Sequence, residues 1–184
     1  GKRNIDWRLS YLPARDGGGQ CTLRWLNKNI KNPKLTELGW EAGQIKALRE
    51  FMASPYGLCL IAGQTSSGKS TVIAAMLDEM KRNGRSINTL EDPVEFGLGI
   101  MQTPIINKKG ETDGFDVASK TLLRHDVDIE MHGEVRDLKG AMNVCRKGST
   151  GQLMLSTLHT SGAVGIAHTL NEQMHVPSSL IGAP

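Results

Sequence analysis

Residues 63–70 read Gly63-Gln64-Thr65-Ser66-Ser67-Gly68-Lys69-Ser70, which matches the pattern G-x-x-x-x-G-K-[ST] of a phosphate-binding loop, or P-loop. An apolar run over 57–62 precedes it and the pattern of an amphipathic helix follows it, which is the context such a loop requires. The glycines let the backbone curl so that consecutive N–H groups point at the phosphates. We expect Lys69 to bridge the β- and γ-phosphates of a nucleoside triphosphate and Ser70 to hold Mg²⁺.

Outward from the loop, segments typical of strands alternate with segments typical of helices. Short apolar runs predict strands over 57–62, 87–90, 128–133 and 152–157. Helical spacing predicts helices from the loop to Arg82, over 115–124, over 138–146 and from about residue 162, with another over 42–52 before the first strand. Such alternation is typical of a mostly parallel sheet with helices on both faces, so we predict an α/β fold of the P-loop, RecA-like class.

The residues before this alternation predict a β-hairpin. Apolar and polar residues alternate over 5–12 and again over 20–26, with the turn Asp16-Gly17-Gly18-Gly19 between the two runs. Residues 1–40 hold eight Lys/Arg and three Asp/Glu, a balance of +5, whereas the rest of the chain has a balance of −2. This basic segment either faces ATP or an acidic neighbour, or is a solvated surface, and both interpretations stay open.

Composition argues against several classes of protein. Three widely spaced cysteines, Cys21, Cys59 and Cys145, show no metal-binding spacing and fit a reduced, cytoplasmic compartment. No signal peptide is recognisable and no apolar run approaches the roughly 20 residues of a membrane span, so we expect any membrane link to come through a partner. A nucleic-acid motor would need basic and aromatic surfaces, but aromatic residues are only 4% of the chain, so no direct nucleic-acid binding is expected.

Three further blocks follow the P-loop. They are Thr89-Leu90-Glu91-Asp92-Pro93-Val94-Glu95-Phe96, then Gly133-Glu134-Val135-Arg136-Asp137, then residues 150–160, which end in Leu158-His159-Thr160. Together with residues 63–71, they resemble the Asp box, the Walker B block and the His box of the ATPases that drive type II and type IV secretion and type IV pili. The resemblance covers nearly all of residues 5–181. It implies that residues 1–35 are the end of an N-terminal domain plus a linker, and that 36–184 are an ATPase core whose C-terminal part is truncated.

The acidic residues of the first block follow a predicted strand, and ligands bind at the carboxyl ends of strands in open α/β sheets. Carboxylates at that edge can hold Mg²⁺ or polarise a water molecule. The resemblance implies this role for Glu91, Asp92 and Glu95. Without it, the alternative is a solvated acidic turn before Pro93.

Glu134 also ends a predicted strand, where a carboxylate could activate the water that attacks the γ-phosphate. The resemblance makes Glu134 the catalytic glutamate and His159 a sensor of the nucleotide state, although a lone histidine is otherwise more often structural. It also implies that the hairpin arginines Arg8 and Arg24 approach the nucleotide, as Thr71 does at the end of the P-loop. Arg136 could pair with an acidic residue or reach a phosphate.

The P-loop and the His box depart from the family pattern. The family usually has Pro-Thr-Gly where this chain has Gln64-Thr65-Ser66. If that position requires a positive φ, Ser66 costs of order 1 kcal/mol. The first histidine of the His box is Gln152 here.

The Walker B strand, normally apolar, contains Glu130 and His132, and alternation places both on one strand face with Glu134. Ionisable groups on a central sheet face are costly unless they are paired. We consider three interpretations: a mutually satisfied pair of Glu130 and His132, a destabilised strand with impaired turnover, or a metal site formed by alternate residues.

The P-loop alone indicates a nucleoside triphosphate but not the reaction; together with it, the resemblance implies an enzyme that hydrolyses ATP to ADP and phosphate with Mg²⁺. The resemblance implies a homo-oligomeric, hexameric ring that powers pilus assembly, pilus retraction or protein secretion. Such a ring is expected in the cytoplasm, attached peripherally to the inner membrane through a platform protein. The alternative, which the polar Walker B strand favours, is a non-hydrolysing nucleotide-binding subunit with a structural role in the same kind of assembly.

Overall fold

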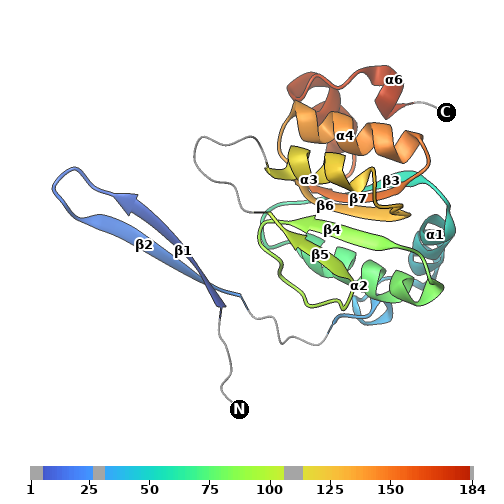
Figure 1. The fold of residues 1–184 in the computed structure, drawn as a ribbon, viewed down its shortest axis with the longest axis horizontal. Coiled ribbons are helices and arrows are strands. Elements are labelled where there is room, and N and C mark those ends of the chain that lie inside the picture. The colour runs from blue at the N-terminus through green and yellow to red at the C-terminus, as the bar shows by residue number, and fades with distance from the viewer. Residues whose placement is uncertain (1–5, 27–31, 106–113, 183–184) are drawn as a thin grey trace, which may run out of the picture.

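The computed structural model of the chain describes residues 6–26, 32–105 and 114–182. Within them, a five-stranded parallel sheet carries helices on both faces, and a two-stranded antiparallel hairpin precedes it (Figure 1). The strands are β1 (Asp6–Pro13), β2 (Gly19–Leu26), β3 (Gly57–Ala62), β4 (Ile87–Glu91), β5 (Met101–Pro104), β6 (Ile129–Val135) and β7 (Leu153–Leu158). The helices are α1 (Ala42–Ala53), α2 (Lys69–Met80), α3 (Gly114–Leu122), α4 (Leu138–Ser149), α5 (Gly165–His168) and α6 (Ser178–Ile181), with 3-10 turns at Leu35–Glu37 and Lys81–Asn83 and a π-helical segment at Thr169–Gln173.

The strands of the sheet are arranged in the order β3-β7-β6-β4-β5, and every neighbouring pair is parallel. Because each strand is followed by a crossover, the carboxyl ends of β3, β4, β6 and β7 meet at one edge of the sheet. The alternating pattern of the sequence is confirmed, and this edge is where the predicted motifs lie.

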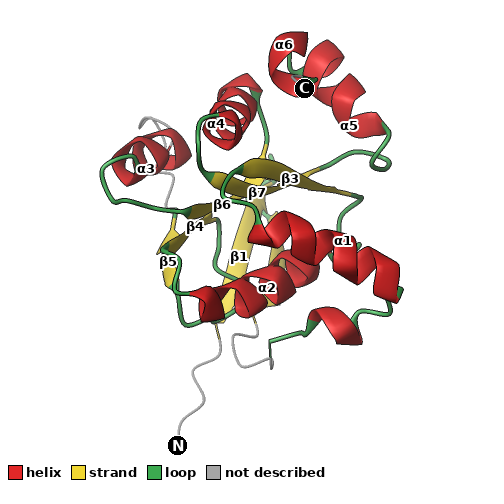
Figure 2. Ribbon diagram, turned by 90° about the vertical axis from the view of Figure 1, so that its right-hand side faces the viewer, coloured by secondary structure: helices red, strands yellow, loops and turns green. Residues whose placement is uncertain are grey.

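Two helical layers cover the sheet: α1 and α2 lie on one face, and α3, α4, α5 and α6 on the other (Figure 2). In the first layer, Met76 and Leu77 of α2 pack in one cluster with Ile129 of β6, all three fully buried. In the second, Val144 of α4 packs with Met154 of β7. Burying one such side chain contributes about 1.5–3 kcal/mol, so these contacts hold the helix that follows the P-loop firmly on the sheet.

The predicted hairpin is confirmed, and it projects away from the sheet (Figure 1). Its cross-strand partners include Trp7 with Trp25 and Arg8 with Arg24. Adjacent residues point to opposite faces of a strand, so the hairpin has one apolar face and one basic face. Parts of the sequence predictions, Ile5 and residues 27–31 of the linker predicted over 27–35, lie outside the described residues.

Two features differ from the sequence prediction. β5 was not predicted, because its four residues are too few to show an alternation of apolar and polar positions. The helix predicted from about residue 162 begins at Gly165 as α5 and continues directly into the π-helical segment, and α6 follows as a separate short helix. Gly162 and Gly165 weaken the start of that helix, and Pro177 cannot continue it.

Candidate nucleotide-binding site

A cleft of about 480 Å³ opens at the carboxyl edge of the sheet, between the P-loop and the loops that follow β4 and β6. All four predicted motifs reach it, because successive βα units deliver their loops to the same edge. Gly63, Gln64 and Ser67 belong to the P-loop but do not line the cleft. The predicted site residues that do line it are Arg8, Arg24, Thr65, Ser66, Gly68, Lys69, Ser70, Thr71, Glu91, Asp92, Glu95, Glu134 and His159.

The P-loop joins β3 to α2 with a backbone that suits its sequence. Gly68, directly before α2, has a φ of 93°, in the left-handed region that glycine tolerates. Ser66 has a φ of 64°, so a serine does occupy a position suited to glycine, at a cost of about 1–2 kcal/mol. The Nζ of Lys69 donates hydrogen bonds to the carbonyl oxygens of Gly63 (2.9 Å) and Gln64 (2.8 Å). These bonds place the ammonium group within the curl of the loop.

The end of β6 is interrupted by an irregularity of the β-bulge type. Its register with β7 shifts between His132 and Val135. Two hydroxyl groups of β7 donate to carbonyl oxygens there: Ser156 to that of His132, and Thr157 to that of Gly133 (2.8 Å). Side chains of the neighbouring strand thus hydrogen-bond the backbone at the point where the register shifts, which helps a buried strand to carry the bulge.

The bulge changes which way the following side chains face. Before it, Met131 packs in the cluster that contains α2; after it, Val135 packs in the cluster that contains α4. The strict alternation predicted from the sequence therefore ends at His132. Glu134 does not continue the face formed by Glu130 and His132 but lines the cleft.

Glu134 lies among polar side chains from three motifs. Its Oε2 accepts a hydrogen bond from Nε of Arg136 at 3.1 Å, and its Oε1 lies 3.4 Å from Nε2 of His159. Arg136 also approaches Asp92, with 3.6 Å between Nη1 and Oδ2. Of the two interpretations of Arg136, the structure supports pairing with acidic residues. These groups are partly exposed, so the pairs contribute little to stability and instead define the wall of the cleft.

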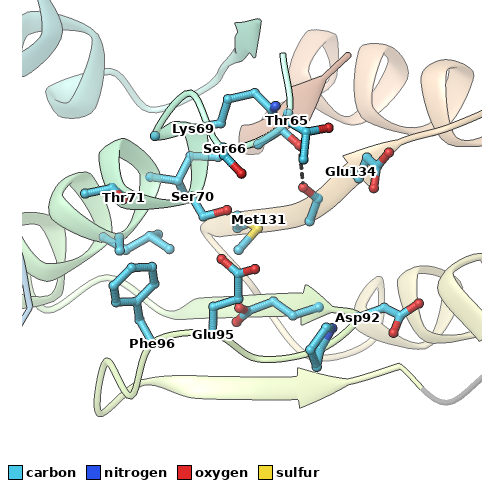
Figure 3. Close-up of a pocket in the computed structure, with 18 of the residues that line it drawn as sticks. Thr65, Ser66, Lys69, Ser70, Thr71, Asp92, Glu95, Phe96, Met131 and Glu134 are labelled. Carbon is cyan, nitrogen blue, oxygen red and sulfur yellow. Dashed lines mark hydrogen bonds between the residues drawn. The ribbon is translucent and has the colours of Figure 1, made fainter. Parts of the chain in front are cut away.

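Glu91 and Glu95 lie on the wall opposite the P-loop. Glu91 is buried at the end of β4, and its Oε1 accepts hydrogen bonds from Thr89 (2.6 Å) and Gln102 (2.9 Å). The side chain of Glu95 extends across the cleft toward Ser70 (Figure 3). Sequence reasoning missed Gln102, because it belongs to the unpredicted strand β5.

The hairpin arginines reach the same cleft. Nη2 of Arg8 lies 3.8 Å from Oδ1 of Asp92, and both Arg8 and Arg24 line the cleft, whereas Arg15 does not. Arg8 and Arg24 are cross-strand partners, and like charges directly opposite one another destabilise a hairpin. The stability of the hairpin therefore does not explain why they lie opposite one another, and Asp92 supplies an opposite charge for Arg8.

The polar residues of the Walker B strand face α3 and α4. Glu130 is fully buried, pairs with Nζ of Lys147 at 2.5 Å and accepts a hydrogen bond from Ser119 (2.9 Å). His132 stacks on Phe115, with ring centroids 4.6 Å apart. The opposite charge for Glu130 thus comes from α4, a partner that the sequence hypothesis of a Glu130–His132 pair did not include. Within the described ranges, no group of three or more His, Cys, Asp and Glu could hold a metal ion, so the metal-site interpretation has no support.

Gln152, where the family has the first histidine of its His box, lies just before the amino end of β7 and therefore at the opposite end of the sheet from the cleft. Its Nε2 donates a hydrogen bond to the carbonyl oxygen of Val127 at 2.9 Å. The glutamine at this position therefore makes a local hydrogen bond, and it does not line the cleft.

The oxygen ligands that Mg²⁺ prefers are present on both walls of the cleft. Ser70 provides a hydroxyl, and Asp92 and Glu95 provide carboxylates. Proteins usually hold Mg²⁺ through one or two carboxylates together with substrate phosphates rather than in a cage of their own. This donor set therefore fits a Mg²⁺ ion that is bound jointly with a nucleotide.

Known proteins share this sequence and fold. The type II secretion system ATPase E of Vibrio cholerae is 38% identical over 187 residues, which cover 99% of this chain and 37% of that protein. The type IV pilus assembly ATPase PilB of Thermus thermophilus is 35% identical, over 99% of this chain and 21% of that protein. The solved structure of the pilus retraction motor PilT with bound ADP aligns with a TM-score of 0.68 at 27% identity, over 90% of this chain and 51% of that chain.

This chain thus spans less than two fifths of the length of either curated relative. The sequence pattern of the family described as type II/IV secretion system protein matches residues 1–183, which is nearly the whole of this chain. The P-loop, the acidic wall and the hairpin arginines lie within those residues. The chain therefore belongs to the type II/IV secretion system protein family.

Proposed function

We propose that this chain forms the nucleotide site of an enzyme that hydrolyses ATP to ADP and phosphate with Mg²⁺. The observation that carries the proposal is the convergence of the P-loop, the acidic residues and the hairpin arginines on one cleft. Lys69 and the N–H groups of residues 63–71 hold the phosphates, and Ser70 and Asp92 hold Mg²⁺ together with them. Glu134 orients and activates the attacking water.

The other predicted site residues act around the phosphates, the Mg²⁺ ion and the attacking water. Glu91 and Glu95 complete the acidic wall. His159, 3.4 Å from Glu134, senses whether the γ-phosphate is present. Arg8 and Arg24 supply positive charge for the γ-phosphoryl group as it departs.

Hydrolysis is favoured over the non-hydrolysing alternative. That alternative rested on the polar Walker B strand, yet the carboxylate of Glu130 is paired with Lys147 and hydrogen-bonded to Ser119. The relatives from Vibrio cholerae and Thermus thermophilus are both named as ATPases, which also supports catalysis.

We further propose a cytoplasmic homo-oligomer, a hexameric ring, that is attached peripherally to the inner membrane through a platform protein and powers secretion or pilus movement. The names of the relatives, a secretion ATPase, a pilus assembly ATPase and a pilus retraction motor, support the role in secretion or pilus movement. The ring and the platform protein are what the resemblance to the family implies. Of the helices that the structure describes, none has the length and apolar character needed to cross a membrane. In this proposal, residues 1–35 end an N-terminal domain and residues 36–184 are the ATPase core.

Replacing Lys69 tests the proposed site. Hydrogen bonds to charged groups contribute about 1.5–3 kcal/mol, so Lys69→Ala should weaken ATP binding by about tenfold or more. Binding of a fluorescent ATP analogue measures this, and circular dichroism checks that the fold is kept. Lys46→Ala is the control, because Lys46 is exposed on α1 and does not line the cleft. An affinity of Lys69→Ala within about threefold of the unaltered chain, which is less than 1 kcal/mol, would reject the assignment.

A further inference from the structure

One side chain outside the predicted motifs ties together several parts of the cleft wall. Gln102 lies on β5, and its side chain makes three hydrogen bonds. Its Nε2 donates to Oε1 of Glu91 (2.9 Å) and to the carbonyl oxygen of Phe96 (2.8 Å), and its Oε1 accepts from the N–H of Leu98 (2.9 Å). Both amide hydrogens and the amide oxygen are therefore in use, a combination of donors and acceptor that leucine and ionised glutamate both lack.

These bonds hold the connection between β4 and β5, residues 92–100, against the end of β4. The connection carries Glu95 and Phe96, which line the cleft opposite the P-loop (Figure 3). Without Gln102, the carbonyl of Phe96 and the N–H of Leu98 would lose their partner in a partly buried place, which is unfavourable. The position of this wall thus depends on Gln102.

The same side chain orients Glu91. The carboxylate is buried, and its Oε1 accepts bonds from Gln102 and Thr89, which approach it from β5 and β4. Two donors on one oxygen restrict the rotation of the carboxylate. Among the described residues, the other oxygen, Oε2, makes no hydrogen bond, so it is the atom left to act in the cleft.

We propose that Gln102 is a positioning residue of the nucleotide site, which sets Glu91 and the connection bearing Glu95 at the separation from the P-loop that Mg²⁺-ATP requires. Gln102 acts through these two groups, and it does not line the cleft itself. The proposal rests on the ATP hydrolysis proposed above.

The test compares Gln102→Leu with the unaltered protein, using the full chain. Turnover and the Mg²⁺-dependent binding of a non-hydrolysable ATP analogue should both weaken by about 10- to 100-fold, the range seen when a residue that orients metal ligands is removed. Binding of the analogue without Mg²⁺ should change by less than about threefold, because the P-loop is untouched. Gln102→Glu keeps the size of the side chain but has no hydrogen-bond donor when ionised. It should weaken turnover and Mg²⁺-dependent binding as Gln102→Leu does, and it replaces Gln102→Leu in the test if that variant does not fold.

Thr103→Val is the matched control. It lies on the same strand and loses one side-chain bond, to Asn88 at 3.3 Å, but it does not line the cleft. It should keep the turnover and the Mg²⁺ dependence of the unaltered chain.

A double-mutant cycle with Glu91→Gln separates action through Glu91 from a general effect on the fold. We expect Gln102→Leu to cost less turnover in the Glu91→Gln background than alone. Equal costs in both backgrounds, or unchanged Mg²⁺ dependence in a folded Gln102 variant, would overturn the proposal. If the unaltered chain hydrolyses no ATP, both the proposed function and this inference fail. If the unaltered chain and the Gln102 variants hydrolyse ATP at the same rate, only this inference is overturned.

Discussion

At the scale of single residues, the position of Glu134 depends on the bulge that ends β6. In a regular strand, Glu134 would follow Glu130 and His132 toward α3 and α4. The shift of register after His132 turns it instead toward the P-loop, beside His159 and Arg136. One irregular backbone step therefore brings into the cleft the carboxylate that we propose as the base for the attacking water.

Glu134→Gln should leave ATP binding intact and slow turnover by at least roughly a hundredfold, the scale of general-base catalysis. Glutamine keeps the size of the side chain and removes its basicity, so binding and chemistry separate. Steady-state phosphate release measures turnover, and equilibrium binding of ATP checks affinity. Glu91→Gln and Glu95→Gln are the comparison variants. If Glu134→Gln turns over as fast as the unaltered chain while one of these two variants is slow, the role of the base moves to the residue changed in the slow variant.

At the scale of elements, a buried ion pair joins α4 to the central strand β6. Glu130 and Lys147 are both buried, and Ser119 of α3 hydrogen-bonds to each of them. Asn143 of α4 adds a bond to the same hydroxyl at 2.7 Å. The network holds two helices on the strand that carries Glu134, so the polar Walker B strand is a packing feature of this chain.

Lys147→Met should destabilise the protein by about 3–5 kcal/mol, because it leaves the buried carboxylate of Glu130 without its opposite charge. Adding Glu130→Val should restore most of that loss, since apolar replacement of a whole buried pair is often neutral or stabilising. Urea unfolding measures each free energy.

The control for this pair is an exposed one. Lys46 and Glu50 lie 3.9 Å apart on α1, both strongly exposed, so Lys46→Met should change stability by less than about 0.5 kcal/mol. If the losses caused by Lys147→Met and Glu130→Val simply add in the double variant, the two residues do not act as a pair.

At the scale of the whole molecule, the hairpin and the sheet jointly form the cleft. Arg8 and Arg24 reach it from the basic face of the hairpin, and Arg8 approaches Asp92. Two cationic side chains of the core line the cleft, and both are already engaged: Lys69 with P-loop carbonyls, and Arg136 with Asp92 and Glu134. We therefore expect the hairpin to supply the further positive charge at the γ-phosphate.

If the hairpin arginines act on the site of a neighbouring subunit, specific activity should rise with protein concentration. Arg8→Ala and Glu134→Gln chains, each inactive alone, should regain activity when mixed, since some interfaces would then hold one complete site. An arginine in this role contributes roughly 10³–10⁵ in rate, so the recovery should be easily measured as phosphate release. Arg15→Ala, on the same hairpin but away from the cleft, should keep its own activity.

Co-assembly of the mixed chains has to be shown by light scattering or crosslinking. No recovery in chains that do co-assemble, together with activity that is independent of concentration, would place the arginines on the site of their own chain.

From the sequence alone come the succession of strands and helices along the chain, apart from β5, the hairpin, and the motifs that gather at one edge of the sheet. Each of these depends on a local signal: the period of apolar residues, or the spacing of glycine, lysine and carboxylate residues within a few positions. The family has glycine where this chain has Ser66, which pointed to a positive φ at that position, and the φ of Ser66 is 64°.

The packing of the elements fixes which way Glu134 faces, what pairs with Glu130, and what holds Glu91. These outcomes depend on contacts between elements: the register of β6 against β7, Lys147 on the helix that covers β6, and Gln102 on a strand too short to show a pattern. Periodicity reports which face of an element is buried, but it carries no information about the side chain that will lie opposite, because that depends on how separate elements pack.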